Sequence, residues 1–177
     1  MRTYINSGFM IMLHRKVELY AHGPGLMLHS PSAATAFQSG KDYSSSLGPG
    51  DGELGEALAT GRVVLLSTGS PGLDYTVILA DSNSPLELSD KPLARAQFSL
   101  VVTDGCLLVR DGYVTTRWGD EAYATERIVL ADGFYLVDAR WMPSFRNGHM
   151  LIHLLLGRTD DPPKNCLGWV DLEFIAS

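Results

Sequence analysis

Hydrophobic and polar residues alternate through the stretch RIVLADGFYLVDARWMP, which runs from Arg127 to Pro143. Successive side chains of a β-strand point to opposite faces, so this pattern predicts two strands with an apolar face. The face expected to enter the core carries Tyr135, Val137, Ala139 and Trp141. Asp132-Gly133 lies between the two apolar runs, and Asp-Gly favours the positive backbone dihedrals of a tight hairpin turn. The stretch therefore predicts a hairpin whose second strand ends at Pro143.

The same alternation recurs along most of the chain, between turns rich in Gly, Pro, Asn, Asp and Ser. The segments with strand patterns are 16–20, 26–28, 62–67, 73–80, 96–103, 106–110, 113–118, 126–131, 134–142, 149–156 and 167–175. We expect the first two to form an opening pair. Asp104-Gly105 and Asp111-Gly112 join the three segments between residues 96 and 118, which predicts a three-stranded meander.

Helical signals gather in one place. Asp51 is a candidate N-cap, residues 53–60 carry acidic side chains in the first turn, and Gly61 follows the last turn. This pattern predicts one short helix of about two turns. The preceding residues 30–52 are rich in Ser, Ala, Gly and Pro, which predicts a long mobile loop with one helical turn near residues 33–37.

Many short strands and one helix predict an all-β fold. We expect an antiparallel β-sandwich, jelly-roll-like in its layout, and an eight-stranded β-barrel is the alternative. A chain of 177 residues suits a single domain over residues 1–177. A domain of that size buries about 70% of its unfolded surface, so the fold requires neither a metal ion nor a disulfide.

Charge narrows the range of partners. The chain has 20 acidic and 14 basic residues, a net charge of -6, and 45% hydrophobic residues, which is a globular composition. The acidic excess repels polyanions and attracts basic proteins, so direct nucleic-acid binding is not expected. The apolar run from Phe9 to Leu13 is too short for a signal peptide, and no run reaches the length of a membrane span. We therefore expect a cytoplasmic protein without membrane contact.

The histidines and cysteines do not form a metal-ligand pattern. His149 and His153 share a strand face but lie about 13 Å apart at the usual rise per residue. His22 and His29 flank a turn without an accompanying carboxylate, and the sequence contains no HExxH or CxxC motif. Cys106 and the other cysteine, Cys166, are expected to be ordinary thiols. No cofactor or metal is predicted.

Motifs for nucleophilic catalysis are also missing from the sequence. There is no GxSxG; residues 67–70 (STGS) form a polar turn after a strand, and Cys106 has no base beside it in the sequence. The glycine-rich run GPGDGELG does not end in Lys-Ser or Lys-Thr, so it is not a phosphate-binding loop. We expect a protein that is not an enzyme.

One connection has the composition of a protein interface. The run WGDEAYATER places acidic and aromatic residues together between two strands, and exposed aromatic and carboxylate side chains are typical of binding surfaces. The candidate partner-binding residues are Trp118, Asp120, Glu121, Tyr123 and Glu126. Two alternatives stand beside this hypothesis. In the first, the connection is solvated and binds no partner. In the second, Trp118 faces the core with Val114 and Thr116.

The order of these elements resembles a known family. The progression QFSLVVTDGCLLVRDGYVTTRW followed by ERIVLADGFYLVDARWMP, roughly residues 96–143, is similar to the layout of the bacterial competence nuclease inhibitor family. The chain departs from that layout in its long Ser/Gly loop and its additional C-terminal strands. The resemblance implies a small acidic bacterial β-sandwich that binds another protein, such as a nuclease or a toxin.

Two classes of function follow. The first is a non-catalytic protein-binding module, an inhibitor or immunity-type protein, whose acidic charge attracts a basic partner such as a nuclease or toxin. The alternative is a β-sandwich or barrel that binds a small ligand, a carbohydrate or a lipid. A filled core favours the first class, whereas a deep pocket lined by convergent polar groups favours the second.

Overall fold

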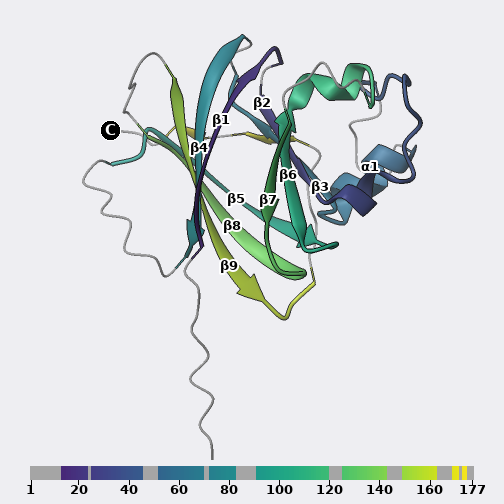
Figure 1. The fold of residues 1–177 in the computed structure, drawn as a ribbon. Coiled ribbons are helices and arrows are strands. Elements are labelled where there is room, and N and C mark those ends of the chain that lie inside the picture. The colour runs from purple at the N-terminus through teal and green to yellow at the C-terminus, as the bar shows by residue number, and fades with distance from the viewer. Residues whose placement is uncertain are drawn as a thin grey trace, which may run out of the picture.

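Two β-sheets pack face to face in the computed structural model (Figure 1). The structure describes residues 13–23, 25–45, 52–69, 72–82, 91–119, 125–142, 149–162, 169–171 and 173–174. The two sheets are separate hydrogen-bonded ladders, which confirms the all-β sandwich over the eight-stranded barrel. No helix among these residues is long and apolar enough to cross a membrane.

Among the described residues, the larger sheet has six strands and the smaller has five. The strands of the six-stranded sheet, in spatial order, are β1 (His14–Ala21), β4 (Leu73–Asp81), β9 (Met150–Thr159), β8 (Gly133–Met142), β5 (Ala94–Val102) and β11 (Glu173–Phe174). Those of the five-stranded sheet are β10 (Trp169–Asp171), β3 (Val63–Ser67), β2 (Gly25–His29), β6 (Cys106–Asp111) and β7 (Thr125–Val129).

Two of the described ladders are parallel, in contrast to the antiparallel sandwich expected from sequence. β4 runs parallel to β9, with Tyr75 opposite Met150, and β10 runs parallel to β3, with Trp169 opposite Leu65. A parallel pair requires a long crossover rather than a tight turn. The alternation of residues within a strand carries no information about such a distant partner.

The core lies between the sheets and is filled by alternate residues of both. Its fully buried side chains include Leu26, Leu66, Val77, Leu100, Val137 and Ile152. The face expected for β8 is confirmed, because Tyr135 is 5% exposed while Leu136 on the opposite face is 52% exposed. Trp141 is half-buried against this core.

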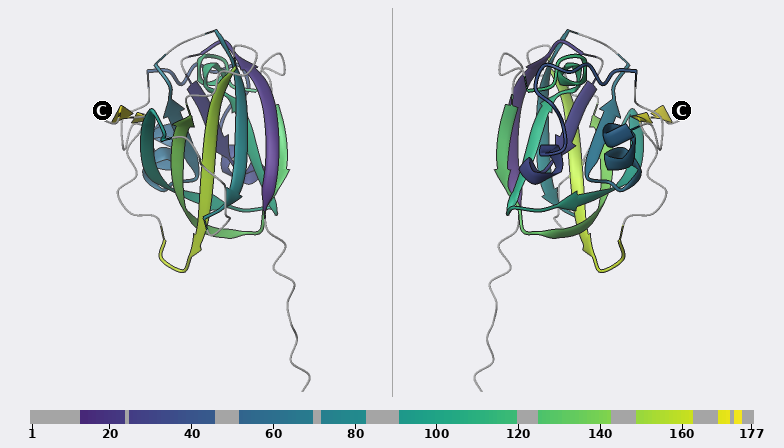
Figure 2. Two further views of the ribbon diagram at one scale, coloured as in Figure 1. Left: turned by 90° about the vertical axis from the view of Figure 1, so that its left-hand side faces the viewer. Right: turned by 90° about the vertical axis from the view of Figure 1, so that its right-hand side faces the viewer.

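Helical elements cover the outer face of the five-stranded sheet. These are α1 (Gly52–Ala59) and two 3-10 helices, η1 (Pro31–Ala34) and η2 (Gly112–Thr116), and all three lie on one side of the sandwich (Figures 1 and 2). The helix expected over residues 53–60 is thus confirmed to within one residue. Its proposed N-cap, Asp51, lies outside the described residues.

Part of the expected loop contributes to this cover. Pro31–Ala34 forms η1, near the helical turn expected at residues 33–37. Phe37 is 9% exposed and Tyr43 is 1% exposed. The Tyr43 backbone N–H donates to the Thr115 carbonyl at 2.7 Å, which ties this segment to η2. Ala33, Phe37 and Tyr43 therefore anchor this segment on the sheet, and the mobility of the loop stays a prediction.

The expected three-stranded meander is wrong. Asp104 and Gly105 have φ angles of 63° and 62°, and Thr103 bridges Cys106, so the tight turn forms as expected. The strands on its two sides then diverge, because β5 belongs to the six-stranded sheet and β6 to the five-stranded one. The third expected strand, residues 113–118, is largely the 3-10 helix η2.

The hairpin expected at Asp132-Gly133 also crosses between sheets. It joins β7 of the five-stranded sheet to β8 of the six-stranded one. The Gly105 N–H donates to Asp132 Oδ1 at 2.6 Å, so the two Asp-Gly crossings lie side by side. The expected opening pair is wrong for the same reason, because β1 and β2 belong to different sheets. The C-terminal segment is likewise split between β10 and β11.

Candidate functional site

The structure places the two ends of the predicted interface connection on the five-stranded sheet. Asp120, Glu121 and Tyr123 lie outside the described residues. Trp118 ends the segment that follows η2, and Glu126 lies in β7. The binding role of this connection stays a prediction, and the structure defines the surroundings of Trp118 and Glu126.

Trp118 is buried, at 4% exposed, so of the two orientations considered from sequence the structure has the inward one. Its ring centroid lies 4.4 Å from that of Phe37 and 6.0 Å from that of Tyr43, both in edge-on geometry. Lys41 accepts a hydrogen bond from the Trp118 backbone N–H at 3.0 Å. The indole belongs to an apolar cluster beneath the helical cover, with Met27, Ala33, Leu54, Ala57, Leu58, Val63, Leu65 and Val114.

His29 is the polar member at the edge of this cluster. Its ring lies 5.8 Å from Trp118, and Nδ1 is 2.8 Å from the Ser30 carbonyl, so Nδ1 carries the donated proton. Nε2 is buried without a hydrogen-bond partner. Burial lowers the pKa of His29 to about 4, although the contact with Ser30 opposes the shift. His29 is therefore neutral at physiological pH.

Glu126 projects from the rim of the sandwich. β7 is an edge strand of the five-stranded sheet, and Glu126 pairs with Val109 of β6. It shares a strand face with Ile128, which is in the core, but Glu126 itself is exposed. A charged side chain on an edge strand hinders pairing with another edge. Glu126 thus favours contact through side chains over strand addition at β7.

Asp111 organises one end of the sandwich. It is fully buried and accepts three backbone hydrogen bonds, from the N–H groups of His22 at 2.7 Å, Gly23 at 3.1 Å and Tyr113 at 2.8 Å. These bonds hold the β1–β2 turn against the start of η2. The sequence predicts only a hairpin turn at Asp111-Gly112, because two of the hydrogen-bond donors to Asp111, His22 and Gly23, are remote in the chain.

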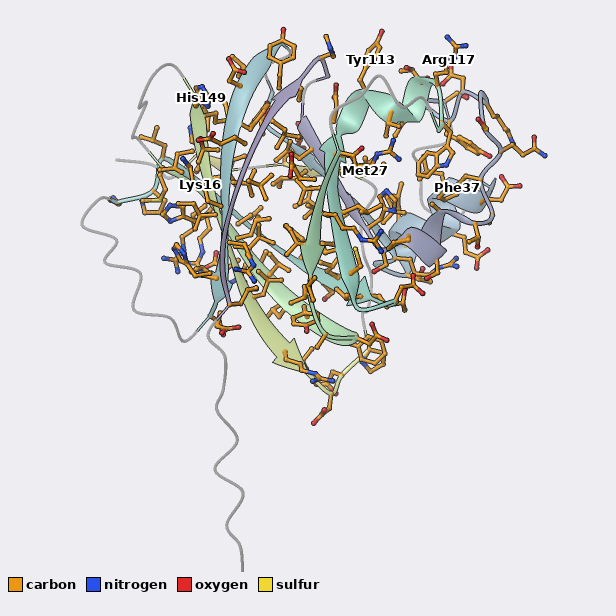
Figure 3. All side chains as sticks on the ribbon, in the orientation of Figure 1. Lys16, Met27, Phe37, Tyr113, Arg117 and His149 are labelled. Carbon is orange, nitrogen blue, oxygen red and sulfur yellow. The ribbon has the colours of Figure 1, made fainter. Side chains whose placement is uncertain are left out.

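Three exposed aromatic side chains surround this end. Tyr20 and Tyr113 are each 44% exposed, and the Tyr20 ring meets the His22 ring at 4.9 Å with an interplanar angle of 82°. Tyr113 points away from the body of the sandwich (Figure 3). The sequence pattern offers His22 only as a histidine beside a turn, and Tyr20 and Tyr113 only as strand residues. Tyr20 alternates with the buried Leu19 and Ala21, and that position could have marked it as exposed.

The outer face of the six-stranded sheet carries an ion-pair network. Asp138 accepts hydrogen bonds from Arg95 at 2.6 and 2.9 Å, and from Arg140 at 2.9 and 2.7 Å. Burial opposes ionisation of Asp138, but these donors outweigh it and keep its pKa below the ordinary value. The shared face of Asp138 and Arg140 is as expected, and Arg95 is an addition from the neighbouring strand.

His153 lies beside this network, opposite Arg140 in the β8–β9 ladder. It is 7% exposed, and neither ring nitrogen has a hydrogen-bond partner. Burial lowers its pKa, and Arg140 and His14 add to the shift. Within the described part of the chain, no three His, Cys, Asp or Glu side chains gather as metal ligands.

Comparison with known proteins identifies one relevant fold. No protein-family model matches the chain, and no characterised relative matches it by sequence. Among solved structures, ComJ from Bacillus subtilis, an inhibitor of the DNA-degrading activity of NucA, matches with a TM-score of 0.55 and 9% identity. The match covers 84% of this chain and 99% of that of ComJ. The chain is similar in fold to ComJ. At the level of fold, this confirms the resemblance drawn from the order of strands.

Proposed function

We propose that this chain is a non-catalytic, inhibitor-type protein that binds a basic protein, such as a nuclease or a toxin. The observation that carries the proposal is the fold likeness to ComJ, an inhibitor, over 84% of this chain and 99% of ComJ. The net charge of -6 supports it, because an acidic protein attracts a basic enzyme over long range.

The interior gives further support against the small-ligand alternative. The described space between the sheets is occupied by apolar side chains, among them Val17, Leu28, Tyr75, Leu79, Val109 and Leu154. The hydroxyl groups of Tyr75 and Thr68 form a hydrogen bond with each other, at 2.6 Å. A carbohydrate or lipid site would require a cavity with convergent polar groups. The filled core favours binding at the surface.

The acidic connection is the proposed source of electrostatic attraction. Its last described residue before the gap, Gly119, is exposed, and the chain re-enters the five-stranded sheet at Thr125. In the sequence, Asp120 and Glu121 fall within this passage, and Glu126 follows it in the edge strand β7. Exposed carboxylates at a rim increase association rate and partner selectivity more than they increase affinity.

Inhibition of DNA degradation tests the proposal. Purified nucleases from the organism that encodes this chain, with NucA alongside them, are incubated with DNA and increasing amounts of the full-length protein. The proposal expects one nuclease to lose activity at an equimolar ratio and to form a complex in analytical ultracentrifugation. Equal degradation of DNA with and without the protein, for every nuclease of the panel, would contradict it.

A matched pair of charge variants makes this test specific. D120N/E121Q/E126Q removes three acidic groups from the proposed passage, while E56Q/D160N/D161N removes three exposed acidic groups from α1 and from the residues after β9. Both variants change the net charge equally. We expect only the first to require a higher protein concentration for inhibition. The same weakening in both would mean that net charge alone attracts the nuclease.

A further inference from the structure

The end of the sandwich at Asp111 carries three exposed aromatic side chains. Tyr20 contacts His22 ring to ring, and a Cβ added at the next residue, Gly23, would lie 3.0 Å from Tyr113 Cβ. The three side chains come from β1, the β1–β2 turn and η2, so they are brought together only by the fold. We call Tyr20, His22 and Tyr113 the aromatic end.

The backbone beneath the aromatic end is held tightly. A Cβ at Gly23 would lie 2.8 Å from the Tyr113 nitrogen, and one at Gly25 would lie 2.1 Å from the Leu66 carbonyl oxygen. Only glycine permits these approaches. Together with the three hydrogen bonds to Asp111, this packing fixes the turn that carries His22 and the start of η2. Side chains on a fixed backbone bind with a smaller loss of conformational entropy.

The surroundings of the aromatic end favour a cation. Asp74 is exposed and lies directly opposite Tyr20 in the β1–β4 ladder, so both side chains share one face. A tyrosine ring attracts a guanidinium or ammonium group over its face, and a neighbouring carboxylate adds to that attraction.

The ring geometry is unsuited to a flat sugar ring. Tyr20 and His22 meet at 82°, so they offer one ring face and one ring edge rather than a continuous platform. Flexible side chains such as arginine and lysine can follow such an angular surface. Tyrosine and arginine are also enriched among the residues that dominate protein interfaces.

We propose that the aromatic end, with Asp74, is the docking surface for an arginine- or lysine-rich loop of a protein partner. This inference rests on the proposed function and deepens it, because it adds a short-range anchor to the acidic passage. The passage attracts the partner from a distance, and the rings hold a basic side chain after contact.

Nuclear magnetic resonance with labelled tyrosine rings tests the docking surface. The full chain, with ¹³C-labelled tyrosine, is titrated with a nine-arginine peptide, a nine-glutamate peptide and a cellulose-derived hexasaccharide. We expect the arginine peptide alone to shift the signals of Tyr20 and Tyr113. The signals of Tyr43 and Tyr75, which are 1% and 0% exposed, should stay in place.

Substitutions then measure the contribution of each ring. Y20S and Y113S should each weaken binding of the arginine peptide about two- to fivefold, the range expected for an exposed cation–π contact. D74N should weaken it as well. The control L136S changes a side chain that is 52% exposed on β8, and its affinity should match that of the unmodified protein. A melting temperature for each variant verifies that folding is retained.

Several results would overturn the docking surface. The first is equal affinity of Y20S/Y113S and the unmodified protein for the arginine peptide. The second is a shift of the ring signals by the hexasaccharide instead of the arginine peptide. The third is a shift that follows protein concentration alone, which would indicate binding of a second copy of the chain.

The outcome is separable from the proposed function. If a nuclease is inhibited equally by the unmodified protein and Y20S/Y113S, the docking surface fails while the inhibitor role stands. If the rings bind the arginine peptide but no nuclease is inhibited, the inhibitor role fails while the docking surface stands.

Discussion

The outer faces of the two sheets differ in what covers them. On the five-stranded sheet, α1, η1 and η2 form a third layer, and Trp118 and His29 become interior residues beneath it. On the six-stranded sheet, no described helix covers the outer face (Figure 2). Arg95, Asp138 and Arg140 form an ion-pair network there. The character of a strand face is therefore set by the elements that pack on it as well as by its own residues. A substitution on the covered face should therefore lower the free energy of unfolding more than a substitution on the open face.

The largest effect is expected for Trp118→Ala. This change removes a side chain that is 4% exposed from the cluster with Phe37 and Tyr43, so the free energy of unfolding should fall by about 3–5 kcal/mol. Urea unfolding of the variant measures the loss. Leu136→Ala on the open face is the control, and its effect should stay within about 0.5 kcal/mol. Equal losses of stability in the two variants would contradict the expected difference between the covered and the open face.

A pH-dependent loss of stability is the next largest effect, and it is specific to the covered face. The pKa of His29 is about 4 in the folded protein and about 6.5 when the chain is unfolded. The unfolded chain therefore binds the proton more tightly, so protonation favours unfolding. Protonation of His29 should therefore lower the free energy of unfolding by about 3 kcal/mol as the pH falls from above 6.5 to 4.

The variant His29→Phe isolates this contribution. Phenylalanine does not titrate and leaves no buried nitrogen without a partner. The free energies of unfolding of the two proteins, measured with urea between pH 7 and pH 4, should diverge in favour of the variant as the pH falls. Parallel curves would mean that His29 is not the group responsible.

A smaller effect is expected on the open face. Asp138→Asn removes the charge that Arg95 and Arg140 share, and the side chain of Asp138 is 15% exposed, so about 1 kcal/mol of stability should be lost. Urea unfolding at low and high salt measures it, and added salt should reduce the difference. The control is Lys16→Gln, which breaks a more exposed pair with Glu18 and should leave stability unchanged. A loss as large as that of Trp118→Ala would contradict the comparison.

The sequence predicted local structure more accurately than connections. Alternation in β8 correctly gave the buried face of Tyr135 and Val137, and helix signals gave α1. Asp104-Gly105 correctly predicted a tight turn. It could not predict that β5 and β6 diverge into different sheets, because turn chemistry fixes the direction of the chain over four residues and not the neighbour that each strand finds.

The candidate site shows the same limit. An acidic connection between Trp118 and Glu126 is visible in composition, but the burial of Trp118 depends on Phe37 and Tyr43 from a distant loop. The aromatic end was missed because Tyr20 and Tyr113 are 93 positions apart and meet only through Asp111. Sequence patterns reveal which residues are exposed, whereas the fold decides which of them are neighbours.

The association rate of D120N/E121Q/E126Q tests the central claim most directly. Stopped-flow mixing with the inhibited nuclease, over a series of salt concentrations, compares this variant with the unmodified protein and with E56Q/D160N/D161N. If the acidic passage attracts a basic partner, its variant should associate more slowly at low salt and depend less on salt, while its melting temperature stays nearly unchanged. An unchanged rate with an unchanged salt dependence would show that the passage is only a solvated connection.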